Sequence, residues 1–203
     1  MKPYIVALTG ARGVLYGLRI VKTLAELGHS IALVVSEPAR LVLHEEMQTP
    51  SSAFTKAEDF KNILSSEVLD RVTIYSPRDF TAPIASGSYP VAGMIIAPCS
   101  MGTLGAIASG LSQNLIHRAA DCVIKEGRRL VIVPRETPLS AIHLENMLKL
   151  ARLGVRVVPA MPAFYSGAAG LDDMIDFVAG KALDQLEIPH TLYPRWTGSL
   201  AKK

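Results

Sequence analysis

The residues from Tyr4 to Gly17, YIVALTGARGVLYG, constrain the fold more than any other stretch of the chain. Ile5 to Leu8 form a short apolar run, and Thr9 and Gly10 break it where a turn is needed. Apolar residues then recur near the helical period until Gly28. The pattern is typical of a strand, a loop and a helix whose N-terminal N–H groups and dipole bind a phosphate. On this stretch alone, a strand-to-helix turn without a ligand is an equal alternative.

Short apolar runs alternate with helical patterns along the rest of the chain. Strands are predicted over residues 31–35, 72–75, 94–97, 130–133 and 155–158. Helices are predicted over residues 38–47, 55–64, 142–153 and 172–186, with another beginning at Gln113. This alternation favours a single-domain α/β fold: a doubly wound, mostly parallel sheet with helices on both faces. We expect the domain to span residues 1–190, followed by a C-terminal arm over residues 191–203.

The chain is unusually apolar, with 49% hydrophobic residues and a mean hydropathy of +0.28. These values would also fit a membrane protein, but no uninterrupted apolar segment approaches the length that spans a bilayer. A sheet covered on both faces takes up part of the excess, and subunit interfaces take up the rest. We therefore expect a homo-oligomer that does not bind membranes.

Charge and cysteine usage argue against other partners. The net charge is +3, and Lys and Arg are not gathered into a basic stripe, so nucleic-acid binding is not expected. Cys99 and Cys122 lie in apolar stretches without metal-ligand spacing, and no secretory signal precedes the first strand. We expect a cytoplasmic protein with free thiols and no metal site.

Polar residues follow two of the predicted strands. Ser100 to Thr103 come after residues 94–97, and Arg135 and Glu136 come after residues 130–133, between two prolines. In an open α/β sheet, ligands bind outside the carboxyl ends of the strands, so both groups are candidates for a binding site. The alternatives are close helix packing after Ser100 and a structural ion pair between Arg135 and Glu136.

Other polar residues have an ordinary explanation beside the functional one. Ser36 follows the strand over residues 31–35, where it caps the next helix or binds a ligand. Glu46 ends that helix, either at a solvated tip or held toward a site. Arg118, Asp121 and Lys125 share one helix face, where local pairing through Asp121 is the usual arrangement.

Eight motifs in order along the chain resemble the UbiX-type flavin prenyltransferases. They are G-A-x-G-x-x-Y-G at Gly10–Gly17, S-G-S at Ser86–Ser88, P-C-S-M-G-T-L at Pro98–Leu104, N-L-I-x-R-A-A-D at Asn114–Asp121, V-P-R-E-T-P at Val133–Pro138, H-L-E-N-M-L-K-L at His143–Leu150, P-A-F-Y at Pro162–Tyr165 and P-R-W at Pro194–Trp196. The resemblance implies a Rossmann-like flavoprotein. It further implies that the chain joins a dimethylallyl group from dimethylallyl phosphate to N5 and C6 of reduced FMN, without a metal. The product, prenylated FMN, serves a partner decarboxylase of the UbiD type. The resemblance also implies that the chain, like members of the family, forms a dodecamer with the flavin at subunit contacts.

The resemblance also implies roles for individual residues. The FMN site comprises Gly10, Ala11, Arg12, Ser36, Ser100, Met101, Gly102, Thr103 and Arg135. Ser86, Tyr165 and Lys181 bind dimethylallyl phosphate, with Arg118 and Lys125 near its phosphate. The catalytic candidates are Glu46, Glu136, Arg118, Lys125 and Trp196. Cationic groups and a phenol would stabilise the leaving phosphate, and Glu136 would mediate proton transfer.

Arg12 departs from the family, which has a small serine at this position. A guanidinium is much larger and always charged, so we expect FMN binding to be spared and prenyl transfer to be slowed, with Arg12 pairing with Glu46 or Glu136. A non-catalytic FMN carrier is therefore one alternative function. Another is an FMN-dependent cysteine decarboxylase of the same superfamily, but Pro159–Tyr165 lacks the asparagine and tryptophan of its P-x-M-N-x-x-M-W motif.

Overall fold

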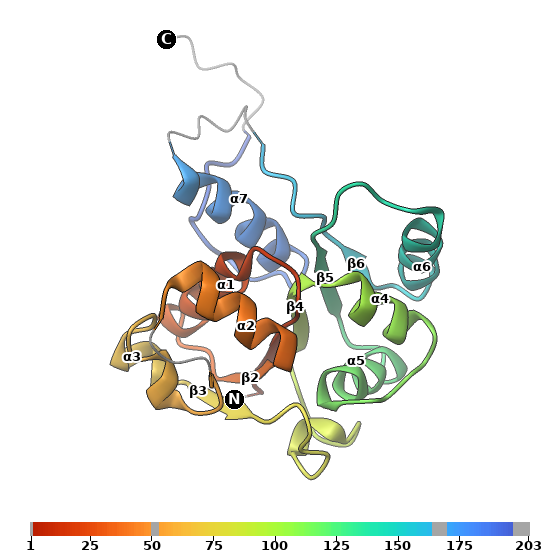
Figure 1. Cartoon of the computed structure of the whole chain (residues 1–203), viewed down its shortest axis with the longest axis horizontal. Coiled ribbons are helices and arrows are strands. Elements are labelled where there is room, and N and C mark those ends of the chain that lie inside the picture. Colours follow the sequence, from red (N-terminus) through yellow and green to blue (C-terminus); the bar gives the residue numbers. More distant parts are fainter. Residues whose placement is uncertain (1, 50–52, 164–169, 197–203) are drawn as a thin grey trace.

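Six parallel strands form the centre of the molecule, and helices cover both faces of the sheet (Figure 1). The computed structural model describes residues 2–49, 53–163 and 170–196. In this part of the chain the strand order is β3-β2-β1-β4-β5-β6, and every neighbouring pair is parallel. The strands are β1 (Tyr4–Leu8), β2 (Ile31–Val35), β3 (Val72–Tyr75), β4 (Gly93–Cys99), β5 (Leu130–Pro134) and β6 (Arg156–Val157). The predicted doubly wound α/β fold is confirmed.

The helices divide between the two faces of the sheet. They are α1 (Val14–Glu26), α2 (Glu37–Met47), α3 (Ser66–Leu69), α4 (Met101–Ala108), α5 (Leu115–Lys125), α6 (Ala141–Arg152) and α7 (Leu171–Asp184), with short 3₁₀ helices η1 (Ala57–Phe60) and η2 (Pro83–Ala85). Helices α1, α2, α3 and α7 share one hydrophobic cluster, whereas α4, α5, α6 and η2 share the other. None of the helices in the described residues is both long and apolar enough to cross a membrane.

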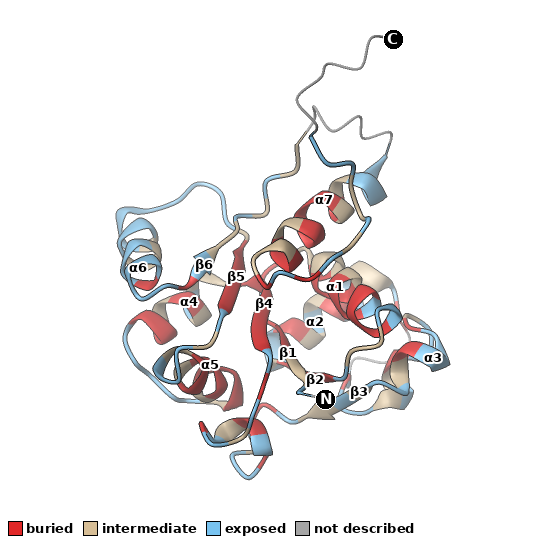
Figure 2. Cartoon of the chain, turned by 180° about the vertical axis from the view of Figure 1, so that it is seen from behind, coloured by how far each residue is buried: buried red, intermediate tan, exposed pale blue. Residues whose placement is uncertain are grey.

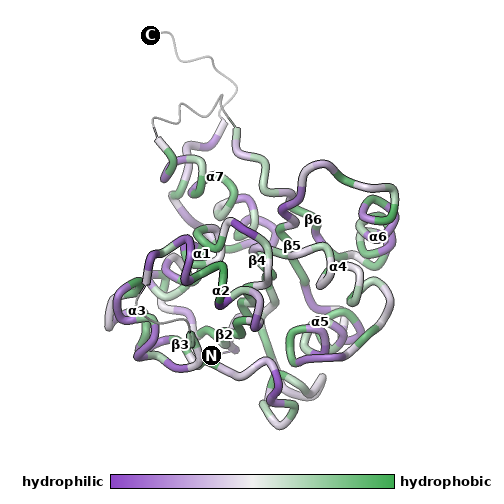
Figure 3. Tube along the Cα trace, viewed as in Figure 1, coloured by the Kyte–Doolittle hydropathy of each residue, from purple (hydrophilic) through white to green (hydrophobic). Residues whose placement is uncertain are grey.

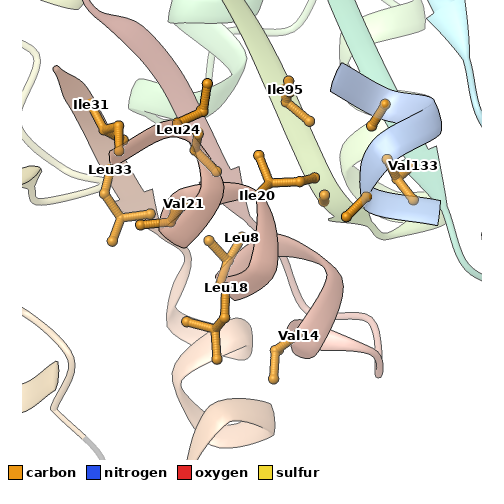
Figure 4. Packing of buried hydrophobic residues seen from close by; sticks show 14 of the residues in the cluster. Leu8, Val14, Leu18, Ile20, Val21, Leu24, Ile31, Leu33, Ile95 and Val133 are labelled. Atoms are coloured by element: carbon orange, nitrogen blue, oxygen red, sulfur yellow. The ribbon is translucent and has the colours of Figure 1, made fainter. Parts of the chain in front are cut away.

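Alternate strand residues enter the two clusters because successive side chains point to opposite faces of a sheet. On β1, Val6 and Leu8 lie in the cluster under α1 and α7, whereas Ile5 and Ala7 lie in the cluster under α5. Figure 2 shows β4 and β5 buried along their length, and Figure 3 shows hydrophobic residues following the central strands. Figure 4 shows Leu8 beside Leu18 in the first cluster. The four central strands are therefore apolar without alternation, as expected for a parallel sheet.

Gly17 allows α1 to lie directly against β4. A Cβ atom at this position would be 2.1 Å from the carbonyl oxygen of Ala97, a separation that real atoms do not adopt. Because the obstacle is backbone, no side-chain movement would relieve it. The close approach fixes the start of α1 over the middle of the sheet, between β1 and β4.

The predicted surface helix over residues 55–64 is wrong. The chain forms the short η1 there and starts again at α3. Asp59 accepts hydrogen bonds from the backbone N–H groups of Thr55 and Lys56, which ends the helical pattern on its N-terminal side. Phe60 is fully buried and packs edge-on against Phe54, with ring centroids 5.1 Å apart. Burial of this ring, rather than helical periodicity, decides the local conformation.

Candidate functional site

The strand order reverses between β1 and β4, and the predicted flavin-binding residues follow the strands at this edge. Gly10, Ser36, Ser100 and Arg135 come just after β1, β2, β4 and β5 respectively. Parallel strands end at the same edge of a sheet, so the structure brings these residues together, as the sequence predicts.

Thr9 joins the ends of β1 and β4. Its buried hydroxyl donates to the carbonyl oxygen of Pro98 at 2.8 Å and accepts from the N–H of Ser100 at 2.7 Å. Both contacts satisfy backbone groups where the ladder between these strands stops. The two loops that flank the reversal therefore have one shared, fully bonded anchor.

Glu46, at the end of α2, contacts the loop between β1 and α1. Its carboxylate accepts hydrogen bonds from the N–H of Gly13 at 2.8 and 3.1 Å and from the N–H of Val14 at 3.0 Å. A carboxylate is unfavourable at the C-terminus of its own helix, but here it lies at the positive N-terminus of α1. These two N–H groups, which the sequence assigns to a phosphate, are not available to one while this contact holds.

Arg12 does not pair with Glu46 or Glu136, so that expectation is wrong. Its guanidinium donates to Glu45 at 3.0 Å, and the two side chains are 65% and 58% exposed. Its backbone carbonyl accepts from Nε of Arg135 at 3.0 Å. Neighbouring loop residues are thus bound to α2 on one side and to the end of β5 on the other.

Ser36 and Ser100 cap the helices that follow them. Ser36 accepts from the N–H of Ala39 at 3.2 Å, and Ser100 accepts from the N–H of Thr103 at 3.3 Å and donates to its hydroxyl at 3.1 Å. Beside them, a Cβ atom at Gly102 would meet no atom within 4 Å, so the start of α4 faces open space. Hydroxyls and exposed backbone next to such space fit a flat ligand with carbonyl or phosphate oxygens, which FMN is.

Arg135 and Glu136 line a small pocket of about 80 Å³ with Pro159 and Met161. They have separate partners: Arg135 bonds the loop at Arg12, and Glu136 accepts from the N–H of Thr137 at 3.0 Å. Glu136 is exposed, so its carboxylate can reach a bound molecule. The structural ion pair that the sequence left open is not the arrangement found here.

Tyr16, in the first turn of α1, lies beside the loop after β1, and sequence reasoning gave it no role although it stands in the first motif. Its ring lies 3.0 Å from the position that a Cβ of Gly13 would occupy. Partial burial raises the pKa of Tyr16, Arg135 opposes the increase, and Glu46 adds to it. With a raised pKa, the phenol stays protonated at neutral pH.

The residues assigned to the prenyl donor are not brought together with the strand ends. Ser86 Oγ lies 2.8 Å from Ser88 Oγ in the loop after η2. On α5, Arg118 donates to the carbonyl oxygen of Ala85 at 2.9 Å and to Asp121 at 3.0 Å, which confirms local pairing through Asp121. Lys125 pairs with Glu126 at 2.6 Å.

Lys181 lies on the other face of the sheet, on α7, whereas Arg118 and Lys125 lie on α5 (Figure 1). Trp196 is 71% exposed beyond α7, and Tyr165 lies outside the described residues. One chain therefore presents the predicted donor-binding residues on two faces. The described residues also contain no group of three or more His, Cys, Asp or Glu side chains that could hold a metal ion.

Comparison with known proteins extends these observations to the whole chain. Residues 1–183 match the family model described as Flavoprotein. The chain is 50% identical over 196 residues to the flavin prenyltransferase UbiX of Halalkalibacterium halodurans, with 95% of this chain and 92% of that protein covered.

Solved structures agree with the sequence match. A dodecameric FMN-dependent UbiX-like decarboxylase from Escherichia coli O157:H7 has a TM-score of 0.84 and 43% identity, over 98% of this chain and 100% of that chain. AnUbiX (PadA1) in complex with FMN and dimethylallyl pyrophosphate also has a TM-score of 0.84, at 38% identity over 98% of each chain. Similarity of this extent, in a chain whose motif residues meet at the strand ends, means that this protein belongs to the UbiX family of flavin prenyltransferases.

Proposed function

We propose that this protein transfers a dimethylallyl group from dimethylallyl phosphate to N5 and C6 of reduced FMN. The observation that carries the proposal is the convergence of Gly10, Ser36, Ser100 and Arg135 at the strand-order reversal, in a chain similar to flavin prenyltransferases over nearly its whole length. Reduced FMN supplies the nucleophilic ring atoms. The protein's own residues supply binding, orientation and proton transfer.

Residues at the strand ends hold the flavin. The Ser36 and Ser100 hydroxyls and the backbone around Gly10 and Gly102 suit its phosphate and ring oxygens. The Arg135 guanidinium, fixed by the Arg12 carbonyl, presents its remaining N–H groups to the same region. Because these groups are already anchored in the fold, they need little reorganisation to bind a planar ligand.

Transfer breaks the allylic C–O bond, and phosphate leaves with the electron pair. Lys181 and Tyr165 are proposed to bind this phosphate, with Ser86, Arg118 and Lys125 contributing further donors. Cationic groups stabilise the charge that develops on the leaving oxygen. Closing the second bond, to C6, consumes the C=C bond of the attached group: its middle carbon takes up a proton, and C6 gives one up. The exposed Glu136 carboxylate is the proposed group that moves this proton, with Glu46 as a second catalytic candidate and Trp196 closing the site.

A homo-oligomer follows from the placement of these residues, and a dodecamer with flavin at the subunit contacts is the proposed form. Donor-binding residues on α5 and α7 lie on opposite faces of one sheet, so a second copy is needed to place both beside one flavin. Helix α6 also leaves three large apolar side chains exposed, Ile142 at 68%, Leu144 at 54% and Leu148 at 51%. Contiguous exposed apolar residues mark protein interfaces.

We also propose, from the family, a partner, a cellular location and domain bounds. The product would serve a decarboxylase of the UbiD type, and the protein would act in the cytoplasm. Residues 1–190 would form the FMN-binding domain and residues 191–203 the arm. The carrier and cysteine decarboxylase alternatives are not favoured, because relatives that match nearly the whole chain are named flavin prenyltransferases.

Anaerobic incubation with reduced FMN and dimethylallyl phosphate tests the function. We expect the mass of the released flavin to rise by one dimethylallyl group. Glu136→Gln should still bind FMN and donor but form product slowly. Recovery of unmodified FMN from the wild-type protein at all donor concentrations would support the carrier alternative instead.

A further inference from the structure

Asp184, in the last turn of α7, is the centre of a polar network that has no role in the proposed reaction. Asp184 accepts hydrogen bonds from the Tyr193 hydroxyl and from both terminal nitrogens of Arg195, at 2.8 and 2.6 Å. His190 Nε2 lies 3.1 Å from the same carboxylate, and the His190 side chain is only 1% exposed. One carboxylate thus fixes three side chains of the segment over residues 190–196.

The histidine tautomer is determined by its neighbours. The N–H of Leu192 donates to His190 Nδ1 at 3.2 Å, so Nδ1 is the acceptor and Nε2 carries the proton. That proton is shared between Asp184 and the carbonyl oxygen of Gly180, 3.0 Å away. The imidazole therefore ties the segment to the backbone of α7 as well as to Asp184.

Gly180 allows the rings of His190 and Tyr193 to pack closely against α7. A Cβ atom there would lie 2.6 Å from Cε1 of His190 and 2.7 Å from two ring carbons of Tyr193. The rings of His190 and Tyr193 occupy the space that any larger residue would fill. Glycine in a helix interior costs stability relative to alanine, so its presence in the middle of α7 has a packing reason.

Lys181, the next residue, lies beside the Tyr193 ring. Its ammonium group is 5.2 Å from the centre of the Tyr193 ring and 5.5 Å from the centre of the Phe177 ring. A cation at these distances is attracted to the face of an aromatic ring. The Phe177 and Tyr193 rings also contact each other, with centroids 5.1 Å apart.

We propose that Tyr193, held by Asp184, is a positioning residue that fixes the ammonium group of Lys181 for the phosphate of the prenyl donor. This inference rests on the proposed function and on the role of Lys181 within it. A free lysine side chain loses considerable rotamer entropy when it is immobilised on a ligand. A ring that restricts the ammonium group beforehand removes part of that cost from donor binding.

The test compares Tyr193→Leu, which removes the ring, with Tyr193→Phe, which keeps the ring and loses the hydrogen bonds of the hydroxyl, including those with Asp184 and Arg195. We expect KM for dimethylallyl phosphate to rise about threefold to tenfold in Tyr193→Leu and less in Tyr193→Phe, with kcat nearly unchanged. The inhibition constant of inorganic phosphate should rise in parallel, and FMN affinity should not change.

A double-mutant cycle separates positioning from general stability. In a Lys181→Ala background, Tyr193→Leu should cause no further rise in KM, because the ring has no ammonium group left to position. A second pair of variants tests the packing of the His190 and Tyr193 rings against Gly180. Gly180→Ala should raise KM as Tyr193→Leu does, because the added Cβ would displace these rings. Gly170→Ala is the control at the residue just before the same helix, where a Cβ meets no atom within 4 Å.

Each outcome decides the matter. Equal KM values for Tyr193→Leu and the wild-type protein, or an unchanged loss in the Lys181→Ala background, would overturn the positioning role while leaving prenyl transfer intact. Absence of prenylated flavin in the wild-type protein would instead reject the proposed function. In that case, phosphate binding by the FMN-loaded variants still tests the role of Tyr193.

Discussion

The Glu46 carboxylate, at the end of α2, accepts from the backbone N–H of Gly13 at 2.8 Å and so caps a helix that begins 32 residues earlier in the chain. This contact connects the loop that follows β1 to the C-terminal end of α2. It also determines which charge occupies the N-terminus of α1.

Replacing Glu46 with Ala should destabilise the protein by about 1.5–3 kcal/mol, because it leaves two N–H groups of a helix N-terminus without their charged acceptor. Urea denaturation at pH 7 measures the change. Glu45→Ala is the matched control, since its pair with Arg12 is largely exposed and should contribute less than about 1 kcal/mol. Equal losses in the two variants would contradict the capping role.

Arg12→Ser should change the single-turnover rate of prenyl transfer by no more than about twofold, because the exposed Arg12 guanidinium pairs with Glu45 on α2. Flavin affinity should stay the same. The experiment uses reduced FMN and excess dimethylallyl phosphate with both proteins. A gain of about tenfold or more would restore the expectation drawn from the sequence, that this arginine slows the chemistry.

Asp184→Asn should destabilise the protein at neutral pH and much less in acid. Partial burial alone would raise the pKa of Asp184, but hydrogen bonds from Arg195 and Tyr193 outweigh it and lower the pKa below its ordinary value of 3.8. A carboxyl group with a lowered pKa stabilises the fold above the unfolded-state pKa, and this contribution is lost as pH falls through the folded-state pKa. Thermal melts of both proteins at pH 7 and at about pH 3 should show the difference shrink.

A charge on α6 should weaken subunit association. We expect Leu148→Glu to lower the solution mass measured by light scattering, because burying an unpaired carboxylate in an interface is costly. Leu27→Glu, at an exposed position on the other side of the sheet, serves as the control. If both variants keep the wild-type mass, α6 does not contribute to the assembly.

Cys99 should resist alkylation in the native protein. Complete burial raises the pKa of its thiol to about 12, so almost no thiolate is present at pH 8. Iodoacetamide followed by peptide mass mapping should leave Cys99 unmodified until denaturant is added. Rapid labelling without denaturant would show that β4 opens at this end.

Sequence patterns predicted the strands and most helices because buried runs and helical periodicity report directly on burial. The position of the predicted flavin-binding residues, at the carboxyl edge of the sheet, followed from topology alone, because residues that come after parallel strands lie at the same edge. Partners of individual charges did not follow in the same way. Glu45, rather than Glu46, binds Arg12 because the turn at Gly13 directs the backbone N–H groups to Glu46, a geometry that no local pattern encodes.

The role of Asp184 was also beyond sequence reasoning. Its three partners lie six to eleven residues further on, in a segment without periodicity. Phe60 misled the helix prediction for a similar reason, because its burial depends on Phe54 in a loop. Long-range contacts of single side chains are decided by packing, and packing is a property of the whole fold.

The hydroxyl of Thr9 has a consequence for how a ligand enters. Since it already satisfies the ends of β1 and β4, the loops on either side of the reversal are rigid before any flavin arrives. Binding should then need no slow rearrangement of the backbone, and association should follow a single exponential whose rate rises linearly with flavin concentration. Thr9→Val would keep the shape of the side chain but release both loops, and a rate that saturates with concentration would appear in place of the linear one.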